Sequence, residues 1–393
     1  MTTDGSATGG PLEGVRVLEL AVALAAPSAA AMLGDWGAEV IKVEPLTGDT
    51  QRGNTQNSYF SQDNRGKRSV ALDIATDEGR EVMLQLVDRA DVLVTNIRPG
   101  GLRRLGMDPD SLLRRNPRLV YGLLTGYGSD GPAAGRAGYD MGAFWARAGL
   151  AGALVGPDVA PPVPRPAMGD HTTGLALVAA ITAALFERER SGRGRLVETS
   201  LVRTGAYVIS SDLAAHVNGE RPQAGLRRAL YNPMLACYQA GDGRWFYLLG
   251  LEATRHWPNV AAAVGRTDLL DDERFGDFLG LITHRDALIA LLDEEFATRP
   301  LEEWAAIFDE HDVWWDPVQD FDEVASDPIL AAAGVFRPME GDRTAIAAPA
   351  DVGAPDGVVG ADPELGQHTE EVLLELGMDW EQISGLMARG VIP

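Results

Sequence analysis

Four short runs of apolar, largely β-branched residues occur in the first third of the chain, and stretches with helical periodicity separate them. The runs are nearly continuous rather than alternating, which is typical of parallel strands buried on both faces. Strands that alternate with helices indicate βαβ units, so the expected fold class is α/β, with a Rossmann-like, doubly wound large domain. We predict strands at 15–20, 39–44, 91–95 and 118–124, and helices at 27–35, 77–89 and 109–115.

The later pattern predicts one long helix and then a smaller α+β domain. The longest amphipathic stretch runs from Asp170 to Arg190. A further helix is expected at 200–217, and the Gly-, Pro- and Arg-rich segment 218–228 reads as a linker. The predicted buried face of the long helix consists of Leu175, Val178, Ala179, Thr182 and Leu185. The remaining predictions are a small domain at 229–319 with a strand at 245–250 and helices at 255–264, 284–297 and 301–310, and a last helix at 368–376.

Several common chemical motifs are missing from the sequence. The turn after the first predicted strand reads AVALAAPSAAAML and contains no G-x-G-x-x-G, so a nicotinamide or flavin fingerprint is missing. A G-x-S-x-G serine-hydrolase elbow is missing too, and no His/Asp/Glu spacing resembles a metal site. We therefore predict neither a bound metal nor a permanently bound cofactor.

The charge distribution assigns any anionic ligand to the first part of the chain. The 393 residues have a formal net charge of −23. Residues 1–150 carry 16 basic and 18 acidic side chains, a net charge of −2, whereas the remainder carries 18 and 39, a net charge of −21. Nucleic acid and anionic membrane surfaces are excluded as partners because they would repel such a chain.

The sequence also favours a reducing compartment. Cys237 is the only cysteine, and we expect it to be a buried structural thiol because no partner histidine shares its motif. The polar N-terminus lacks the basic and apolar regions of a signal peptide, and no apolar run approaches the ~18 residues that a membrane span needs. A cytoplasmic enzyme is the expectation.

Asp170 stands directly before the long predicted helix and has two possible roles. Aspartate is a preferred N-cap residue, because its carboxylate accepts the free N–H groups of the first helical turn. The alternative is a nucleophile, since the amides at a helix start can stabilise an oxyanion as the carboxylate attacks a thioester. A carboxylate is a weak nucleophile and needs an activated donor, which an acyl-CoA provides.

A resemblance decides between these roles, because motifs along almost the whole chain are similar to those of class III CoA transferases. This family, also called CaiB/BaiF, includes formyl-CoA and carnitine-type CoA transferases and is related to 2-methylacyl-CoA racemases. The motifs are PLEGVRVLEL (11–20), GAEVIKVEP (37–45), NRGKRSVALDI (64–74), ADVLVTNIRPGGLRRLGMD (90–108), NPRLVYGLLTGYGSDGP (116–132), AGYD (137–140), GDHTTG (169–174), ALFERERSGRGRLVETSL (184–201) and ELGQHTEEVLLELG (364–377).

The resemblance assigns roles by position. Asp170 matches the aspartate that becomes a transient aspartyl-CoA thioester, and Tyr139 matches an active-site tyrosine whose hydroxyl donates toward the reacting groups. Acyl-CoA and a carboxylic acid are the implied substrates. The positions that match the CoA site are Asn96, Arg104, Leu72, Ala25 and Ile97.

Two other functions stay open at this stage. The related racemases have a histidine where this chain has Tyr139, since moving an α-proton needs a group that titrates near neutrality. A 2-methylacyl-CoA racemase or epimerase is therefore the alternative, and a CoA-binding paralogue without turnover is the second. His171 is the only histidine near the predicted centre, and a structural role is favoured over that of a base because adjacent helical residues point in different directions.

Departures from the family pattern concern the acceptor acid. Formyl-CoA transferases have a glutamine where this chain has Leu24, and a glycine-rich loop where it has YNPMLACYQAGDGRW, so the pattern argues against oxalate as the acceptor. The apolar Leu24, with Trp314 and Trp315 as an aromatic wall, favours a medium-sized, largely apolar carboxylate.

The resemblance also implies an interlocked, ring-like homodimer. In such proteins two linkers join the large and small domains, and here they correspond to 218–228 and 320–365, after which 366–393 returns to the large domain that begins with 1–217. An interface of that kind exceeds the ~2,000 Å² at which the obligate range begins.

Overall fold

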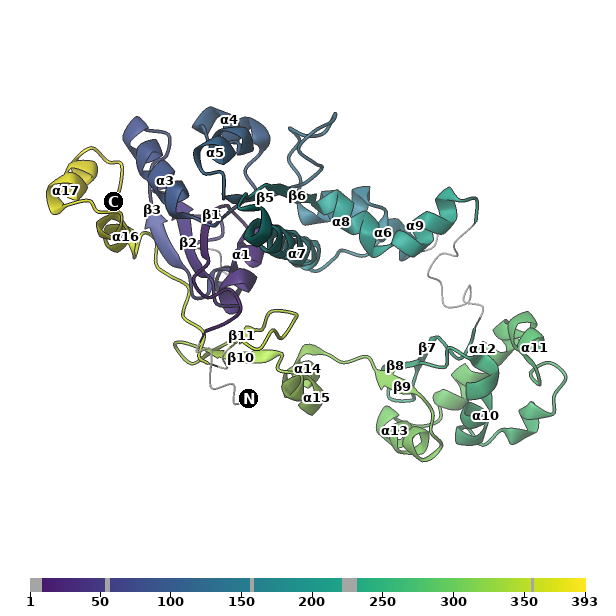
Figure 1. The fold of residues 1–393 in the computed structure, drawn as a ribbon. Helices are drawn as coiled ribbons and strands as arrows, with labels where there is room; N and C mark the ends of the chain where they lie inside the picture. The colour runs from purple at the N-terminus through teal and green to yellow at the C-terminus, as the bar shows by residue number, and fades with distance from the viewer. Residues whose placement is uncertain (1–8, 54–56, 156–158, 221–231, 355–356) are drawn as a thin grey trace, which may run out of the picture. The chain divides into compact units, whose positions relative to one another are not determined.

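The computed structural model describes residues 9–53, 57–155, 159–220, 232–354 and 357–393 (Figure 1). They form two compact units. The first comprises Met1–Leu150, Pro162–Leu213 and Ile329–Pro393, and the second comprises Ala151–Pro161 and Ala214–Pro328. Most of the segment 218–228, predicted as a linker, lies outside the described residues.

A six-stranded, fully parallel sheet organises the first unit. The order β3-β2-β1-β4-β5-β6 is that of a doubly wound fold, with the change of direction between β1 and β4. The four predicted strands are confirmed, and two were missed because β3 begins with a charged residue and β6 alternates with polar ones. The strands are β1 (Arg16–Leu20), β2 (Glu39–Glu44), β3 (Arg68–Ala71), β4 (Val92–Thr95), β5 (Val120–Thr125) and β6 (Leu196–Ser200).

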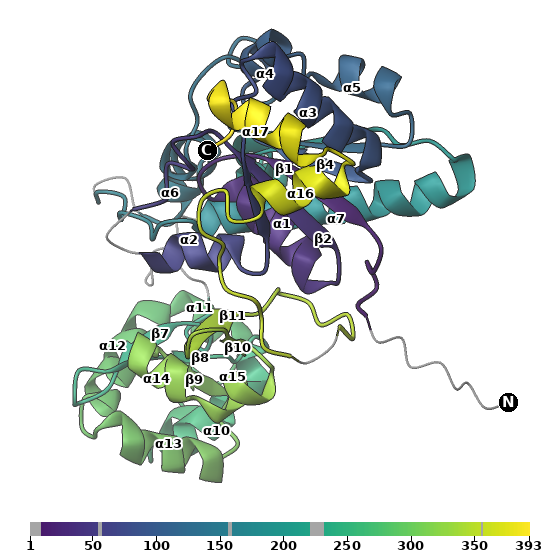
Figure 2. The same cartoon turned by 90° about the vertical axis from the view of Figure 1, so that its left-hand side faces the viewer.

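Helices cover both faces of this sheet, which explains the continuous apolar runs. Neighbouring residues of a strand point to opposite faces, so Val17 packs against α1 (Ala25–Asp35) and α7 (Met168–Ser191), whereas Leu18 packs into the other layer. That second layer is visible in Figures 1 and 2, where the C-terminal helices lie beside β3 and α3. It consists of α3 (Asp77–Arg89), α4 (Pro99–Leu105), α5 (Pro109–Arg115), α16 (Thr369–Glu375) and α17 (Trp380–Ala388).

The C-terminal segment is tied directly to the edge strand. The backbone N–H groups of Ser69 and Ala71 donate to the side chains of His368 and Thr369, at 3.1 and 3.0 Å. Farther along, the N–H of Asp73 donates to the carbonyl of Val391. The first unit therefore contains both ends of the described chain, and its core is completed by the C-terminal residues from Thr369 onward.

The long helix α7 begins earlier than predicted, and its buried face coincides only in part with the predicted one. Its buried residues include Gly174, Leu177, Ile181 and Ala184, whereas the predicted Leu175 is exposed. Val178 and Leu185 of the predicted face are buried, so the prediction was right for these two residues and wrong for Leu175 and Ala179, which are exposed. The buried face is shifted because Gly174 allows α1 to approach closely. By length and composition α7 is apolar enough to cross a membrane, but it packs as a core helix against α1, β5 and β6.

Other boundaries also differ from the predictions. The helix predicted at 200–217 is interrupted at Ile209, giving α8 (Leu201–Val208) and α9 (Ser210–Val217). The segment 320–365 contains α14 (Phe321–Ser326), α15 (Pro328–Ala332) and a hairpin of β10 (Phe336–Met339) with β11 (Arg343–Ile346).

The second unit packs helices around a three-stranded antiparallel sheet. The sheet has the order β7-β8-β9, formed by Cys237–Gln239, Trp245–Leu248 and Trp315–Pro317. A cluster of aromatic rings that includes Phe246, Phe296 and Phe308 fills its core. Cys237 is only partly buried in β7, so the expectation of a buried thiol was wrong. The main helices are α10 (Ala253–Ala263), α11 (Phe278–Thr283), α12 (Arg285–Phe296) and α13 (Leu301–Glu310).

Candidate active site

The helices α1 and α7 begin side by side at the carboxyl edge of the parallel sheet. Helix α1 follows β1, and α7 lies between β5 and β6, so both start at the edge where doubly wound folds bind ligands. Their contact is close, because a Cβ at Gly174 would lie 2.3 Å from the Ser28 hydroxyl and 2.9 Å from the Ala25 carbonyl oxygen. Only glycine fits there, and the two helix starts therefore share one small region.

Asp170 occupies the first turn of α7 but does not cap it. The N-cap position belongs to Ala167, which has a left-handed φ of 69° and whose own side chain makes no capping bond. The capping role predicted from the local pattern is therefore wrong. As the acidic residue in the first turn of α7, Asp170 lies at the positive end of that helix's dipole, which favours negative charge.

The surroundings nevertheless make ionisation of Asp170 costly. Burial, reinforced by the nearby carboxylate of Asp140 and opposed by the charge of His171, raises the pKa of Asp170 to about 7. The charge of Asp63 also raises this pKa, by a smaller amount. Near neutral pH this carboxylate is thus poorly solvated but still accessible as an anion, which suits a nucleophile.

Asp140 connects the loop of Tyr139 to the start of α7. The N–H of Gly169 donates to Asp140 Oδ2 at 3.2 Å, and a Cβ at Gly169 would lie 2.3 Å from Asp140 Oδ1. The buried Oδ1 has no hydrogen-bond partner within the described part of the chain, and burial raises the pKa of Asp140. Tyr139, one residue earlier, is 77% exposed, so its ring is not part of the core.

His171 is held on the side of α7 that faces α2 (Asn57–Asn64). Its Nε2 lies 3.0 and 3.2 Å from the two carboxylate oxygens of Asp63, whose side chain is buried. Burial alone would lower the pKa of His171, but the bond and charge of Asp63, with the charge of Asp170, raise it overall. A protonated His171 therefore places a cation next to Asp170.

A cavity of about 290 Å³ opens at the change of strand direction. Leu72 and Ile97, two of the predicted CoA-site residues, both line it, together with Ala21 and Val22 from the turn after β1. Asn96 holds that turn, accepting the N–H of Val22 at 3.0 Å and donating to its carbonyl at 2.6 Å.

The remaining predicted site residues fall in three places. Ala25 is buried as the first residue of α1, with Leu24 partly buried at its N-cap. Arg104 is exposed on α4, and its guanidinium has no hydrogen bond or ion pair to the residues that the structure describes. Trp314 and Trp315 belong to the second unit, where Trp315 packs on Phe308 with ring centres 5.4 Å apart.

Comparisons with known proteins identify the family of this chain. The family model described as CoA-transferase family III matches residues 12–369. The chain belongs to this family. An (R)-2-hydroxy-4-methylpentanoate CoA-transferase of Clostridioides difficile is 31% identical, over 97% of this chain and 99% of that protein. A cinnamoyl-CoA:phenyllactate CoA-transferase of Clostridium sporogenes is 29% identical, over 95% of each chain.

A solved structure extends the likeness to the fold. A CaiB/BaiF family protein from Brucella suis superposes with a TM-score of 0.83 and 32% sequence identity, over 94% of this chain and all of that one. The chain is therefore a CoA-transferase with a mixed α/β fold, and it uses CoA thioesters as substrates.

Two carboxylates of this family III transferase were missed by the sequence reasoning. Asp140 follows Tyr139 in the motif AGYD, so its position was a usable signal, but its contact with Gly169 spans 29 residues. Asp63 has no comparable signal, because only the packing of α2 brings it to His171. No group of His, Cys, Asp and Glu within the described residues has the arrangement of a metal site.

Proposed function

We propose that the chain transfers CoA from an acyl-CoA to a carboxylic acid by ping-pong chemistry at Asp170. The Asp170 carboxylate attacks the thioester carbonyl and expels CoA thiolate, which leaves an acyl-aspartyl anhydride. The thiolate then attacks the aspartyl carbonyl, forming aspartyl-CoA and releasing the donor acid. The acceptor carboxylate reverses these two steps, so the new acyl-CoA leaves and Asp170 is regenerated without a net proton change.

One observation carries this proposal, namely the poorly solvated carboxylate of Asp170 beside the starts of α1 and α7. The helix amides and dipoles favour the oxyanion that forms when a thioester is attacked. Weak solvation raises the energy of the attacking carboxylate, which helps a group that is otherwise a poor nucleophile. Tyr139, on the loop tied to α7 through Asp140 and Gly169, is the proposed donor to the reacting oxygens.

The CoA moiety is assigned to the cavity at the change of strand direction. Leu72 and Ile97 supply apolar walls for the adenine, and Arg104 supplies a free cation for a phosphate. Asn96 and Ala25 shape the adjacent turn. This part of the chain has a net charge near zero, which suits an anionic ligand better than the strongly acidic remainder.

The proposed acceptor is a medium-sized acid with an apolar tail. Leu24 provides no hydrogen bond for a second carboxylate, which leaves a dianion such as oxalate poorly compensated. The names of two relatives, for 2-hydroxy-4-methylpentanoate and for phenyllactate, contain a branched and an aromatic acid. Trp314 and Trp315 remain the proposed aromatic wall.

The expected result of incubation with acyl-CoA and hydroxylamine is a hydroxamate on the peptide that contains Asp170. A panel of acids, read by mass spectrometry of new acyl-CoA products, is expected to favour branched or aromatic acids over oxalate. A label on another peptide would contradict the mechanism, and transfer to oxalate alone would contradict the assignment of Leu24. Exchange of the α-hydrogen of a 2-methylacyl-CoA with solvent deuterium, without an acceptor acid, would indicate a racemase.

We further propose a cytoplasmic, interlocked homodimer. Helix α9 buries none of its residues in the chain. Tyr207 and Val208 at the end of α8 and Leu213 in α9 are 77%, 50% and 40% exposed, and these are apolar side chains that a second subunit would cover. Light scattering is expected to give twice the chain mass, and Tyr207→Asp is expected to shift the mass toward the monomer. A stable and fully active monomer on dilution would contradict the dimer.

A further inference from the structure

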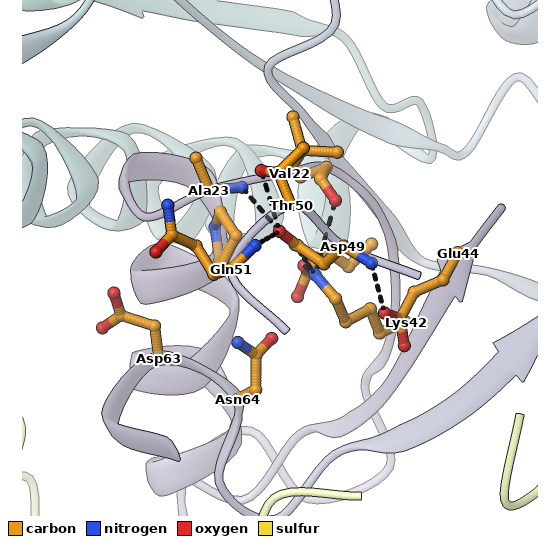
Figure 3. A network of polar contacts seen from close by, with 12 residues as sticks. Val22, Ala23, Lys42, Glu44, Asp49, Thr50, Gln51, Asp63 and Asn64 are labelled. Carbon is orange, nitrogen blue, oxygen red and sulfur yellow. Dashed lines mark hydrogen bonds and ion pairs between the residues drawn. The ribbon is translucent and has the colours of Figure 1, made fainter. Parts of the chain in front are cut away.

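The chain has only two lysines, Lys42 and Lys67, and both are buried in one polar network. They share the buried carboxylate of Glu19, with Nζ to Oε distances of 2.7 Å from Lys42 and 2.6 Å from Lys67. The Lys42 ammonium also contacts Asp49 Oδ2 at 2.8 Å (Figure 3). Two cations and two anions are thus held in the interior of the first unit.

A buried network of charges of this kind is not expected to stabilise the folded state by itself. Removing charges from water is costly, and replacing buried ion pairs by apolar residues is often neutral or stabilising. The cost is visible at Lys67, where burial, reinforced by Lys42 and opposed by Glu19, lowers the pKa to about 8. Because the network is costly to bury, we expect it to position other groups, and its contacts show which groups these are.

The network ends on the turn between β1 and α1. Asp49 Oδ1 accepts the N–H groups of Ala23 at 3.1 Å and Gln51 at 3.0 Å (Figure 3). Asn96 binds the N–H and carbonyl of the preceding residue, Val22, so two side chains hold the turn from different elements. Ala23 between them has a φ of 64°, a left-handed conformation that alanine adopts only when its surroundings impose it.

This turn lies between the proposed CoA cavity and the start of α7, which carries Asp170. Ala21 and Val22 line the cavity together with Leu72 and Ile97. Two residues after Ala23, the carbonyl of Ala25 packs against Gly174, one helical turn after Asp170 in α7. A shift of the turn therefore moves the cavity wall and the support of the nucleophile's helix together.

We infer that Asp49, anchored by Lys42, is a positioning residue for CoA transfer, which fixes Ala23 in the left-handed conformation and so preforms the wall between the CoA cavity and α7. The inference rests on the proposed function, because it describes what holds that site in its reactive geometry. Asp49 acts through the backbone of the turn and does not contact the reacting atoms.

The test compares Asp49→Asn with the double variant Asp49→Asn/Ala23→Gly. The single substitution weakens the anchor, and kcat is expected to fall about tenfold to a hundredfold, the loss typical of a misplaced site. Glycine adopts positive φ without steric cost, so the second substitution is expected to restore a large part of kcat although it adds no contact. KM for the acyl-CoA is expected to change less than kcat.

Two matched controls separate positioning from general damage. Asp91→Asn makes the same change in another ion pair, with the buried Arg188 at the opposite edge of the sheet, and is expected to keep kcat. Asp342→Gly relaxes another left-handed residue, in the hairpin of β10 and β11, and is expected to have no effect. Melting temperatures identify losses that come from unfolding.

The kcat values of these variants decide whether Asp49 is a positioning residue. Wild-type kcat in Asp49→Asn, or a loss that Ala23→Gly does not reduce, would overturn the inference. If Asp49→Asn does not fold, Ala23→Val takes its place, because a branched side chain resists the left-handed conformation, and wild-type kcat in Ala23→Val would overturn the inference. Absence of the Asp170 label in the unmodified protein would instead refute the proposed function.

Discussion

Replacing Asp170 by asparagine is expected to abolish CoA transfer while preserving the fold. The change keeps the shape of the side chain but removes the attacking oxygen anion, so kcat should fall at least about a thousandfold. Acyl-CoA binding should persist, because the cavity that Leu72 and Ile97 line is unchanged. The measurement is steady-state transfer combined with hydroxylamine labelling, which should disappear in the variant.

Asp77→Asn is the matched control for this substitution. Asp77 also lies in the first turn of a helix, but its side chain is 98% exposed at the start of α3. This control variant should transfer CoA at the wild-type rate. Substantial turnover in Asp170→Asn, above the level of the uncatalysed reaction, would mean that another group takes the acyl group.

Activity and stability are expected to respond to pH in opposite directions because of the same carboxylate. Only ionised Asp170 attacks, and its pKa is raised to about 7, so kcat/KM should rise about tenfold per pH unit up to that value and then level off. The folded state binds a proton that the unfolded chain has already lost between about pH 4 and 7, so Asp170 lowers stability as the pH rises through this window.

The comparison with Asp170→Asn isolates this contribution from those of the other carboxylates. At pH 8 the variant should be more stable than the wild type by about 2 kcal/mol or more, and the difference should shrink toward pH 5. Urea unfolding at several pH values measures it. A constant difference across this range would show that the pKa of Asp170 is not raised.

The sequence pattern was sufficient for four of the six strands of the parallel sheet but not for the site. Strands such as β4 and β5 are continuously apolar because helices cover both faces, and this pattern was predictive. The buried face of α7 was predicted only in part, because a hydrophobic pattern does not show that α1 packs closely against Gly174, where a side chain would not fit. Asp170 was singled out by its place in a family motif, whereas its local pattern predicted a cap.

The environment of Asp170 could not be predicted, because it comes from segments far apart in the chain. Asp140 and Asp63 approach the start of α7 through tertiary packing. The anchoring of Ala23 by Asp49 depends on the buried Lys42 of the next strand, and nothing in the sequence around Ala23 predicts a positive φ.

The attachment of the C-terminal segment to β3 has a consequence for biosynthesis. The second unit is largely a contiguous stretch that emerges from the ribosome before the residues that complete the first. During translation, the apolar face of β3 and α3 therefore stays uncovered until α16 and α17 have left the ribosome. A nascent chain stalled before Thr369 therefore presents a hydrophobic surface that a chaperone would recognise.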